Sequence, residues 1–116
     1  TAPVSGGSAS VSSAAAFNLM CVSGELAGKR YPLKNQLVIG RDPKVCQIVF
    51  SASTAGVSGV HCRVTLSGGQ VTVTDLNSSY GTLLADGHKI TPNQPTPLRK
   101  GETFYLGSKT NGFTLQ

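Results

Sequence analysis

Apolar and polar residues alternate along most of the chain after residue 16. The alternation is regular in residues 17–21, 62–66 and 70–75, where the alternate apolar positions are Phe17, Leu19, Cys21, Cys62, Val64, Leu66, Val71 and Val73. Successive side chains of a β-strand point to opposite faces, so a period of two gives each strand one apolar and one polar face. These segments are therefore predicted to be strands that are buried on one side.

Turn-forming pairs separate the apolar stretches at short intervals. Gly68-Gly69 and Asp86-Gly87 have the composition of two-residue hairpin turns. Pro32 lacks the amide hydrogen that an inner strand needs, so its strand is predicted to lie at a sheet edge. The predicted strands cover residues 17–21, 29–33, 36–40, 46–50, 61–66, 70–75, 81–84, 88–90, 103–106 and 113–115.

Many short strands without a helical period favour an all-β fold. The chain has 116 residues with 14 Gly and 6 Pro, which supply frequent turns. The expected architecture is a two-sheet antiparallel β-sandwich of about eleven strands, with the alternating apolar residues forming both inner faces. Loops collect at the two ends of such a sandwich, where binding residues are usually found.

Residues 1–16 differ in composition from the rest of the chain. They consist mainly of Ser, Ala, Gly and Val, carry no charge and are predicted to be a flexible tether. Residues 17–116 are expected to form one domain, and that length can bury a core without disulfides or metals. Because the chain begins at Thr1, it is expected to be a piece of a longer protein. No stretch is apolar for long enough to span a membrane.

The net charge is positive, although charged residues are few. Ten Lys and Arg against five Asp and Glu give +5, which favours anionic partners such as phosphopeptides or nucleic acid. Single-stranded nucleic acid would need stacking aromatic side chains, and the chain has three Tyr, four Phe and no Trp. Since most of the Phe residues fall on apolar strand faces, nucleic acid is not the expected partner.

The three cysteines do not form a recognisable pattern. Cys21, Cys46 and Cys62 contain no Cys-x-x-Cys pair, which argues against a disulfide framework and against a zinc site. Cys21 and Cys62 occupy apolar positions of predicted strands and are expected to be buried thiols. A reducing, cytoplasmic setting is therefore expected, with no metal and no cofactor.

Three predicted loops bring together residue types that bind phosphate. Gly40-Arg41 ends one strand, residues 58–61 lead into another, and residues 75–82 connect two more. An arginine offers a planar pair of donors, hydroxyl groups add hydrogen bonds, and amides in glycine-rich turns can hold an anion. A phosphate dianion needs at least one such positive partner.

The order and spacing of these residues resemble the forkhead-associated (FHA) domain family over about residues 18–116. That resemblance implies an eleven-stranded sandwich that binds an extended phosphothreonine peptide across the loops at one end. It also implies a non-enzymatic interaction module. The matching stretches are Val38-Ile39-Gly40-Arg41, Ile48-Val49-Phe50, Ser58-x-x-His61 and Asp75-Leu76-x-Ser78-x-x-Gly81-Thr82.

The resemblance also assigns roles to single residues. It implies that Arg41 pairs with the phosphate, that Ser58 donates a hydrogen bond to it, and that Ser79 adds a contact. In the family, a small apolar niche for the threonine methyl group explains the preference for phosphothreonine over phosphoserine. The positions implied to brace the loops or to contact the peptide are Gly59, His61, Ser78, Tyr80, Gly81 and Thr82.

Two positions depart from the family pattern. Tyr80 stands where members usually have Asn before the Gly-Thr pair, and Gly59 stands where Asn often follows the binding serine. A tyrosine offers one hydroxyl instead of the paired donor and acceptor of an amide. Both changes are expected to weaken the grip on the peptide and to leave the phosphate site intact. The alternative is therefore a phospho-independent scaffold or interaction domain on the same fold.

Neither catalysis nor a membrane is part of the expected function. Ser58, His61 and Asp75 do not predict a catalytic triad, because a serine three residues before a histidine at a strand start does not place a base beside a nucleophile. The expected partner is a phosphothreonine-containing protein, either a Ser/Thr kinase or a kinase substrate.

Overall fold

The computed structural model describes residues 17–116, and the predicted tether at residues 1–16 lies outside this range. The described residues form ten strands and no helix. The strands are β2 (Phe17–Cys21), β3 (Arg30–Leu33), β4 (Gln36–Gly40), β5 (Ile48–Val49), β6 (Cys62–Ser67), β7 (Gln70–Asp75), β8 (Thr82–Leu84), β9 (Thr96–Leu98), β10 (Thr103–Leu106) and β11 (Gly112–Leu115).

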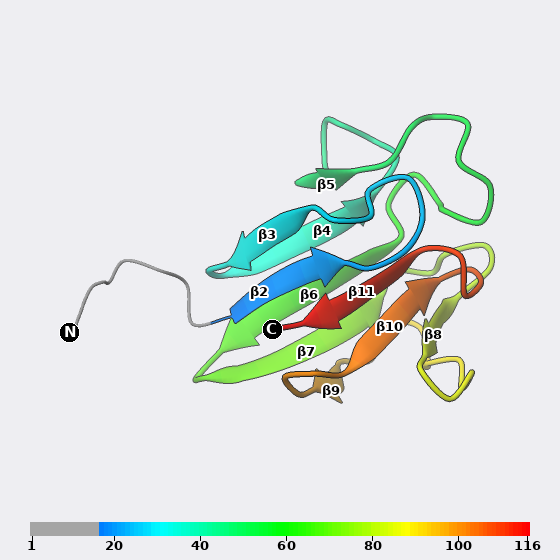
Figure 1. Cartoon of the computed structure of the whole chain (residues 1–116). Coiled ribbons are helices and arrows are strands. Elements are labelled where there is room, and N and C mark those ends of the chain that lie inside the picture. The colour runs from blue at the N-terminus through cyan, green and yellow to red at the C-terminus, as the bar shows by residue number, and fades with distance from the viewer. Residues whose placement is uncertain (1–16) are drawn as a thin grey trace.

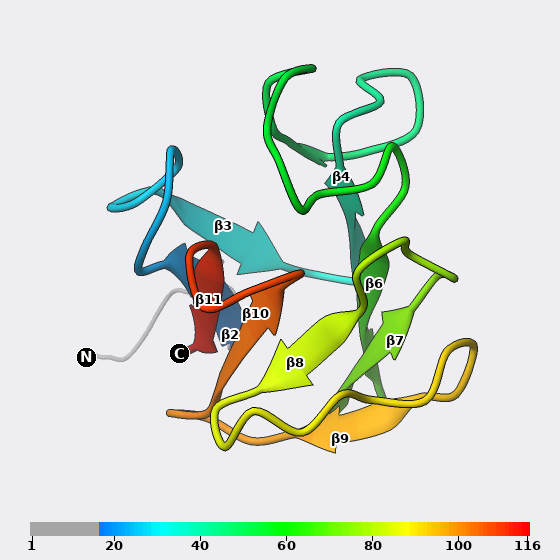
Figure 2. The same ribbon diagram turned by 90° about the vertical axis from the view of Figure 1, so that its right-hand side faces the viewer.

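Two five-stranded sheets face each other, as the sequence predicted (Figure 2). One sheet has the order β3-β2-β11-β10-β8 and the other the order β5-β4-β6-β7-β9. All neighbouring strands are antiparallel except β4 and β5, which pair in parallel with Ile39 opposite Ile48. The predicted antiparallel sandwich is confirmed apart from this one pair, which the sequence did not predict because an apolar pattern does not encode strand direction.

The core lies between the two sheets and contains three fully buried phenylalanines. Phe104 and Phe113 stack with ring centroids 5.6 Å apart, and Phe50 meets Phe113 edge to face at 6.1 Å. Such aromatic pairs add to the stabilisation that their buried area provides. Phe50 directly follows β5, and its amide donates to the Gly40 carbonyl at 2.8 Å. The segment that leaves β5 therefore starts from a fixed point in the core.

Proline marks an edge strand in each sheet. Pro32 lies in β3 at the edge of its sheet, which confirms the prediction. Pro97 lies in β9 at the edge of the other sheet, and this strand was not predicted. Its neighbours Thr96 and Leu98 are too few to show an alternating pattern. The predicted strand at residues 88–90 was wrong, because only Lys89 pairs, as a single bridge to Leu83.

All three cysteines are buried as free thiols, in agreement with the prediction for Cys21 and Cys62. Burial raises the pKa of the Cys62 thiol far above its usual range. Among residues 17–116, no group of three or more His, Cys, Asp or Glu side chains is placed to hold a metal ion. The described part of the chain also has no helix that could cross a membrane.

The two ends of the domain lie next to each other. The Asn18 amide donates to the Gln116 carbonyl and the Gln116 amide donates to the Asn18 carbonyl, both at 2.8 Å. The loops that follow β2, β4, β5 and β7 gather at the other end of the sandwich, on the right-hand side in Figure 1.

Candidate functional site

A pocket of about 300 Å³ lies among the loops at this end of the sandwich. It includes four residues that the sequence singled out: Arg41, Ser58, Ser79 and Tyr80. These residues come from three separate loops, and the fold brings them together at one pocket. The remaining lining residues belong to one segment of the β5–β6 loop, namely Ser53, Thr54, Ala55, Gly56 and Val57.

Arg41 is held in place by a close approach between two glycines. The Gly59 carbonyl accepts hydrogen bonds from the amides of Arg41 and Asp42, both at 2.9 Å. A Cβ atom on Gly40 would lie 2.2 Å from that carbonyl oxygen, so only glycine fits there. Gly59 itself has open space where a Cβ would be. Gly40 is therefore required for the close approach, and Gly59 contributes through its carbonyl.

The Arg41 guanidinium is only partly satisfied within the domain. Its Nη1 donates to the Ala52 carbonyl at 2.6 Å. Its Nε is buried and has no hydrogen-bond partner among residues 17–116. The neighbouring Asp42 carboxylate accepts the Lys44 amide at 2.9 Å. A buried donor without a partner is costly unless a ligand or water supplies an acceptor, so Arg41 is suited to bind an anion.

His61 connects two of the pocket loops from behind the pocket. Its side chain is fully buried, with Nδ1 3.0 Å from the Ser58 amide and Nε2 2.9 Å from the Gly81 carbonyl. The amide can only donate and the carbonyl can only accept. These partners assign the neutral tautomer with the proton on Nε2. His61 thus braces the loops and does not line the pocket, and Ser58 Oγ is not bonded to it.

Ser58 is prepared to donate a hydrogen bond into the pocket. The Ser79 amide donates to Ser58 Oγ at 2.9 Å. That contact uses a lone pair of Ser58 and leaves its hydroxyl proton available for an acceptor. The Ser79 amide is thereby committed, so only the side chain of Ser79 remains for a ligand. The two predicted serines are joined to each other at the pocket.

A buried carboxylate shapes the β7–β8 turn. Asp75 is fully buried and accepts hydrogen bonds from the Ser78 amide at 3.1 Å, from Ser78 Oγ at 2.5 Å and from Thr82 Oγ1 at 2.7 Å. Ser78 Oγ in turn accepts the Gly81 amide at 2.9 Å. Ser78, Gly81 and Thr82 therefore lie below the pocket and hold the turn. Tyr80, at the tip of this turn, is 61% exposed.

The buried His61 side chain also predicts how the stability of the domain depends on pH. Burial lowers the pKa of His61 below its usual value near 6.5. The unfolded chain therefore binds a proton at a higher pH than the folded domain does. The stability that depends on neutral His61 is complete above about pH 6.5 and is lost as the pH falls from there towards the folded pKa.

Urea denaturation between pH 5 and pH 7 measures this effect. We expect the free energy of unfolding to fall towards pH 5 in the parent domain, and the fall to be smaller in His61→Gln, which is less stable throughout. The control is His88→Gln, because His88 lies exposed on the β8–β9 segment. An equal pH dependence in His61→Gln and the parent would contradict the prediction.

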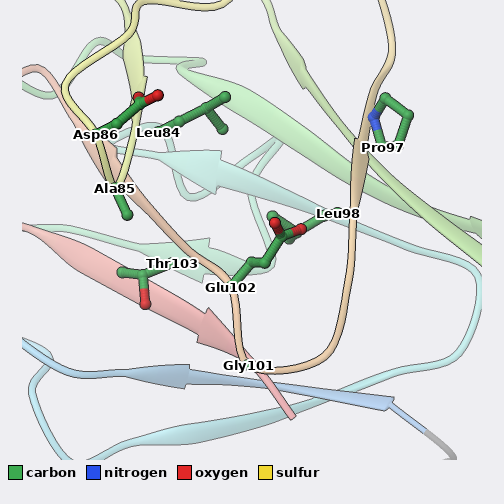
Figure 3. Close-up of a pocket in the computed structure, with 8 residues that line it drawn as sticks. All are labelled: Leu84, Ala85, Asp86, Pro97, Leu98, Gly101, Glu102 and Thr103. Carbon is green, nitrogen blue, oxygen red and sulfur yellow. The ribbon is translucent and has the colours of Figure 1, made fainter.

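A larger pocket of about 410 Å³ lies away from these residues (Figure 3). It sits between the turn after β8 and the turn before β10, and its lining includes Asp86, Leu98 and Glu102. It contains none of the residues predicted to bind phosphate. Two carboxylates would repel a phosphate group, so the smaller, basic pocket is the candidate site.

One residue that supports the pocket was not indicated by any sequence pattern. Glu25, in the β2–β3 loop, accepts the Ser51 amide at 2.8 Å and the Ser51 hydroxyl at 3.1 Å, and it also accepts a hydrogen bond from the Thr54 hydroxyl. These contacts join residues 26 and 29 positions apart, so no local spacing could reveal them.

The chain belongs to the FHA domain family, whose sequence profile matches residues 37–107. FHA domains are interaction modules, and members of the family bind phosphothreonine peptides in phosphorylation-dependent interactions. The matched range contains Arg41, Ser58, His61 and Ser79, which the structure gathers at and behind one pocket.

Similar proteins agree with this family membership. The FHA domain of an Arabidopsis thaliana hypothetical protein is 27% identical, with a TM-score of 0.75 and 92% of each chain covered. A structure from a study of phosphothreonine-dependent FHA domain interactions is 26% identical, with a TM-score of 0.68, 86% of this chain and 94% of that chain covered. A chloroplastic zeaxanthin epoxidase from Prunus armeniaca is 30% identical over 89 residues, which are 72% of this chain and 14% of that protein.

Proposed function

We propose that this domain recognises phosphothreonine in partner proteins. The observation that carries the proposal is Arg41, whose buried Nε has no hydrogen-bond partner in the described part of the chain and which lines a pocket that also offers the Ser58 and Ser79 hydroxyls. Phosphate oxygens would accept from all three side chains, and the guanidinium would supply the positive charge. The 26% identical relative studied for phosphothreonine-dependent interactions supports this assignment.

The lining of the pocket also suits threonine better than serine. Ala55 and Val57 contribute apolar surface next to the hydroxyl-bearing residues. The γ-methyl group of a phosphothreonine would lie against that surface, whereas phosphoserine has no methyl group to bury. One buried methyl group contributes about 0.8 kcal/mol. The partner would be a Ser/Thr kinase or a kinase substrate, and the three buried thiols suit a reducing compartment such as the cytosol.

The proposal predicts that Arg41→Ala removes most of the binding. Loss of two charge-assisted hydrogen bonds would weaken affinity by roughly 100-fold or more, since each contributes about 1.5–3 kcal/mol. A degenerate phosphothreonine peptide library and its unphosphorylated copy, titrated by fluorescence anisotropy, measure this. Circular dichroism checks that the variant is folded.

The matched control is Arg99→Ala, because Arg99 is an exposed arginine at the β9–β10 turn, far from the pocket loops. This variant is expected to bind like the parent. If neither the phosphate nor Arg41 affects binding, the proposal fails. The alternative of a phospho-independent scaffold would then be favoured, for which the exposed Tyr80 at the pocket rim is the motivating observation.

A further inference from the structure

The Ser51–Thr54 turn, which contributes Ser53 and Thr54 to the pocket, lies in the loop between β5 and β6 and has no strand of its own. It begins just after the buried Phe50, and within it the Thr54 amide donates to the Ser51 carbonyl at 3.1 Å. Ser51, Ala52 and Ser53 are exposed, and Ser53 and Thr54 line the pocket. The conformation of this turn therefore decides the shape of one pocket wall.

Two side chains of opposite charge hold this turn. On one side, Arg41 Nη1 donates to the Ala52 carbonyl at 2.6 Å. On the other side, both carboxylate oxygens of Glu25 accept hydrogen bonds from Ser51 and Thr54. The hydroxyls of Ser51 and Thr54 are also 2.7 Å from each other, so their two protons are shared among three contacts. Glu25 belongs to the loop between β2 and β3, so the turn is fixed to the opposite sheet.

Glu25 is in its charged form at neutral pH. Hydrogen bonds from the Thr54 hydroxyl and the Ser51 amide lower the pKa of its carboxyl group. A negative charge bonded to Thr54, which lines the pocket, repels a bound phosphate. The electrostatic effect of Glu25 on phosphate binding is thus unfavourable, and only its hold on the turn can favour binding.

We propose that Glu25 is a positioning residue for the phosphothreonine pocket. It fixes the Ser51–Thr54 turn so that the pocket wall is formed and Arg41 stays at the pocket before a ligand arrives. Binding then requires less ordering of the loop, which raises affinity. This inference rests on the proposed function. It gives Glu25, a residue outside the FHA-like motif, a role in that function.

The two possible effects of Glu25 have opposite signs, so a neutral substitution separates them. Glu25→Gln removes the charge and replaces one acceptor oxygen by a donor, which leaves Ser51 or Thr54 without its partner. If positioning dominates, we expect phosphothreonine-peptide binding to weaken by roughly 5- to 10-fold, the loss of about one hydrogen bond. If charge repulsion dominates, binding becomes as tight as in the parent or tighter, which would overturn the inference.

A double-mutant cycle tests whether Glu25 acts through the turn. Thr54→Val removes the hydroxyl that donates to Glu25 and keeps a side chain of similar size. The double variant is expected to bind no more weakly than the weaker single variant, since both remove the same contact. Full additivity would contradict the inference. The charge control is Asp42→Asn, which also removes one negative charge beside Arg41 and is expected to bind at least as tightly as the parent.

Hydrogen exchange of the free domain provides a readout that needs no ligand. In the parent, the Ser51 amide is protected by its bond to Glu25, and we expect its exchange to be about 10-fold faster in Glu25→Gln. Unchanged protection overturns the inference, even if the peptide binds. A parent that binds no phosphothreonine peptide overturns the proposed function instead, and the exchange rate then decides by itself whether Glu25 orders the turn.

Discussion

Replacement of Gly40 by alanine is expected to destabilise the domain by roughly 3 kcal/mol, at the upper end of the usual cost of overpacking. The new Cβ atom would lie 2.2 Å from the Gly59 carbonyl oxygen and 2.9 Å from Cys46 Sγ. The first of these is a backbone atom that cannot rotate away. It also accepts the amides of Arg41 and Asp42, so moving it breaks two hydrogen bonds.

We expect Gly40→Ala to impair phosphopeptide binding more severely than it impairs folding. Gly59 directly follows Ser58, and Gly40 directly precedes Arg41. A displacement between the two glycines therefore separates the two side chains that we assign to the phosphate. We expect thermal unfolding about 10–20 °C below that of the parent, and no measurable phosphopeptide binding in the fraction that folds.

Gly59→Ala is the matched control for this prediction. No atom lies within 4 Å of the position that its Cβ would take, and its φ angle is not in the left-handed region. The same chemical change in the other partner of the contact should therefore be tolerated. Equal melting temperatures for Gly40→Ala and Gly59→Ala, measured by circular dichroism, would show that the close approach is unimportant.

Asp75→Ala is expected to destabilise the domain by about 3 kcal/mol or more. The substitution leaves the Ser78 amide, the Ser78 hydroxyl and the Thr82 hydroxyl without their common acceptor. Unsatisfied buried donors cost about 1–3 kcal/mol each, and partial entry of water reduces the sum. The β7–β8 turn would lose its shape, and Ser79 and Tyr80 would no longer line the pocket.

Urea denaturation of Asp75→Ala and of a surface aspartate variant tests this expectation. Asp86→Ala is suitable, because Asp86 is exposed and its carboxylate accepts the His88 amide, at 2.8 Å, as its one hydrogen bond within residues 17–116. Its loss should cost well under 1 kcal/mol. A midpoint for Asp75→Ala near that of Asp86→Ala would mean that the buried network contributes little to the fold.

Strand positions could be predicted where apolar and polar residues alternate over several positions. The segments of β6 and β7 show two or three apolar residues at a period of two, and both strands formed with those residues towards the core. Strand β9 has three residues with a proline in the middle, so no period can appear in it. The parallel pairing of β5 was also beyond the sequence, because it depends on the path of the loop after Gly40.

The candidate site was predictable in part for a similar reason. The phosphate-binding residue types stand at strand ends in a recognisable order, which placed Arg41, Ser58 and Ser79 together before any geometry was known. The contacts that hold these three residues in place could not be predicted, because they join distant segments or involve backbone atoms. Glu25 meets the Ser51–Thr54 turn from the opposite sheet, and Ala52 contributes only a carbonyl group that every residue has. Such contacts leave no trace in residue spacing.

Because the two ends of the domain are adjacent, the domain can be inserted into a larger protein. Asn18 and Gln116 are joined by two backbone hydrogen bonds, at the end of the sandwich opposite the pocket loops. A host protein could therefore carry residues 18–116 as an insert in a surface turn, with little distortion of the host and with the pocket facing away. The same proximity permits circular permutation, in which a short linker joins the present ends and new ends open at the Gly68-Gly69 hairpin.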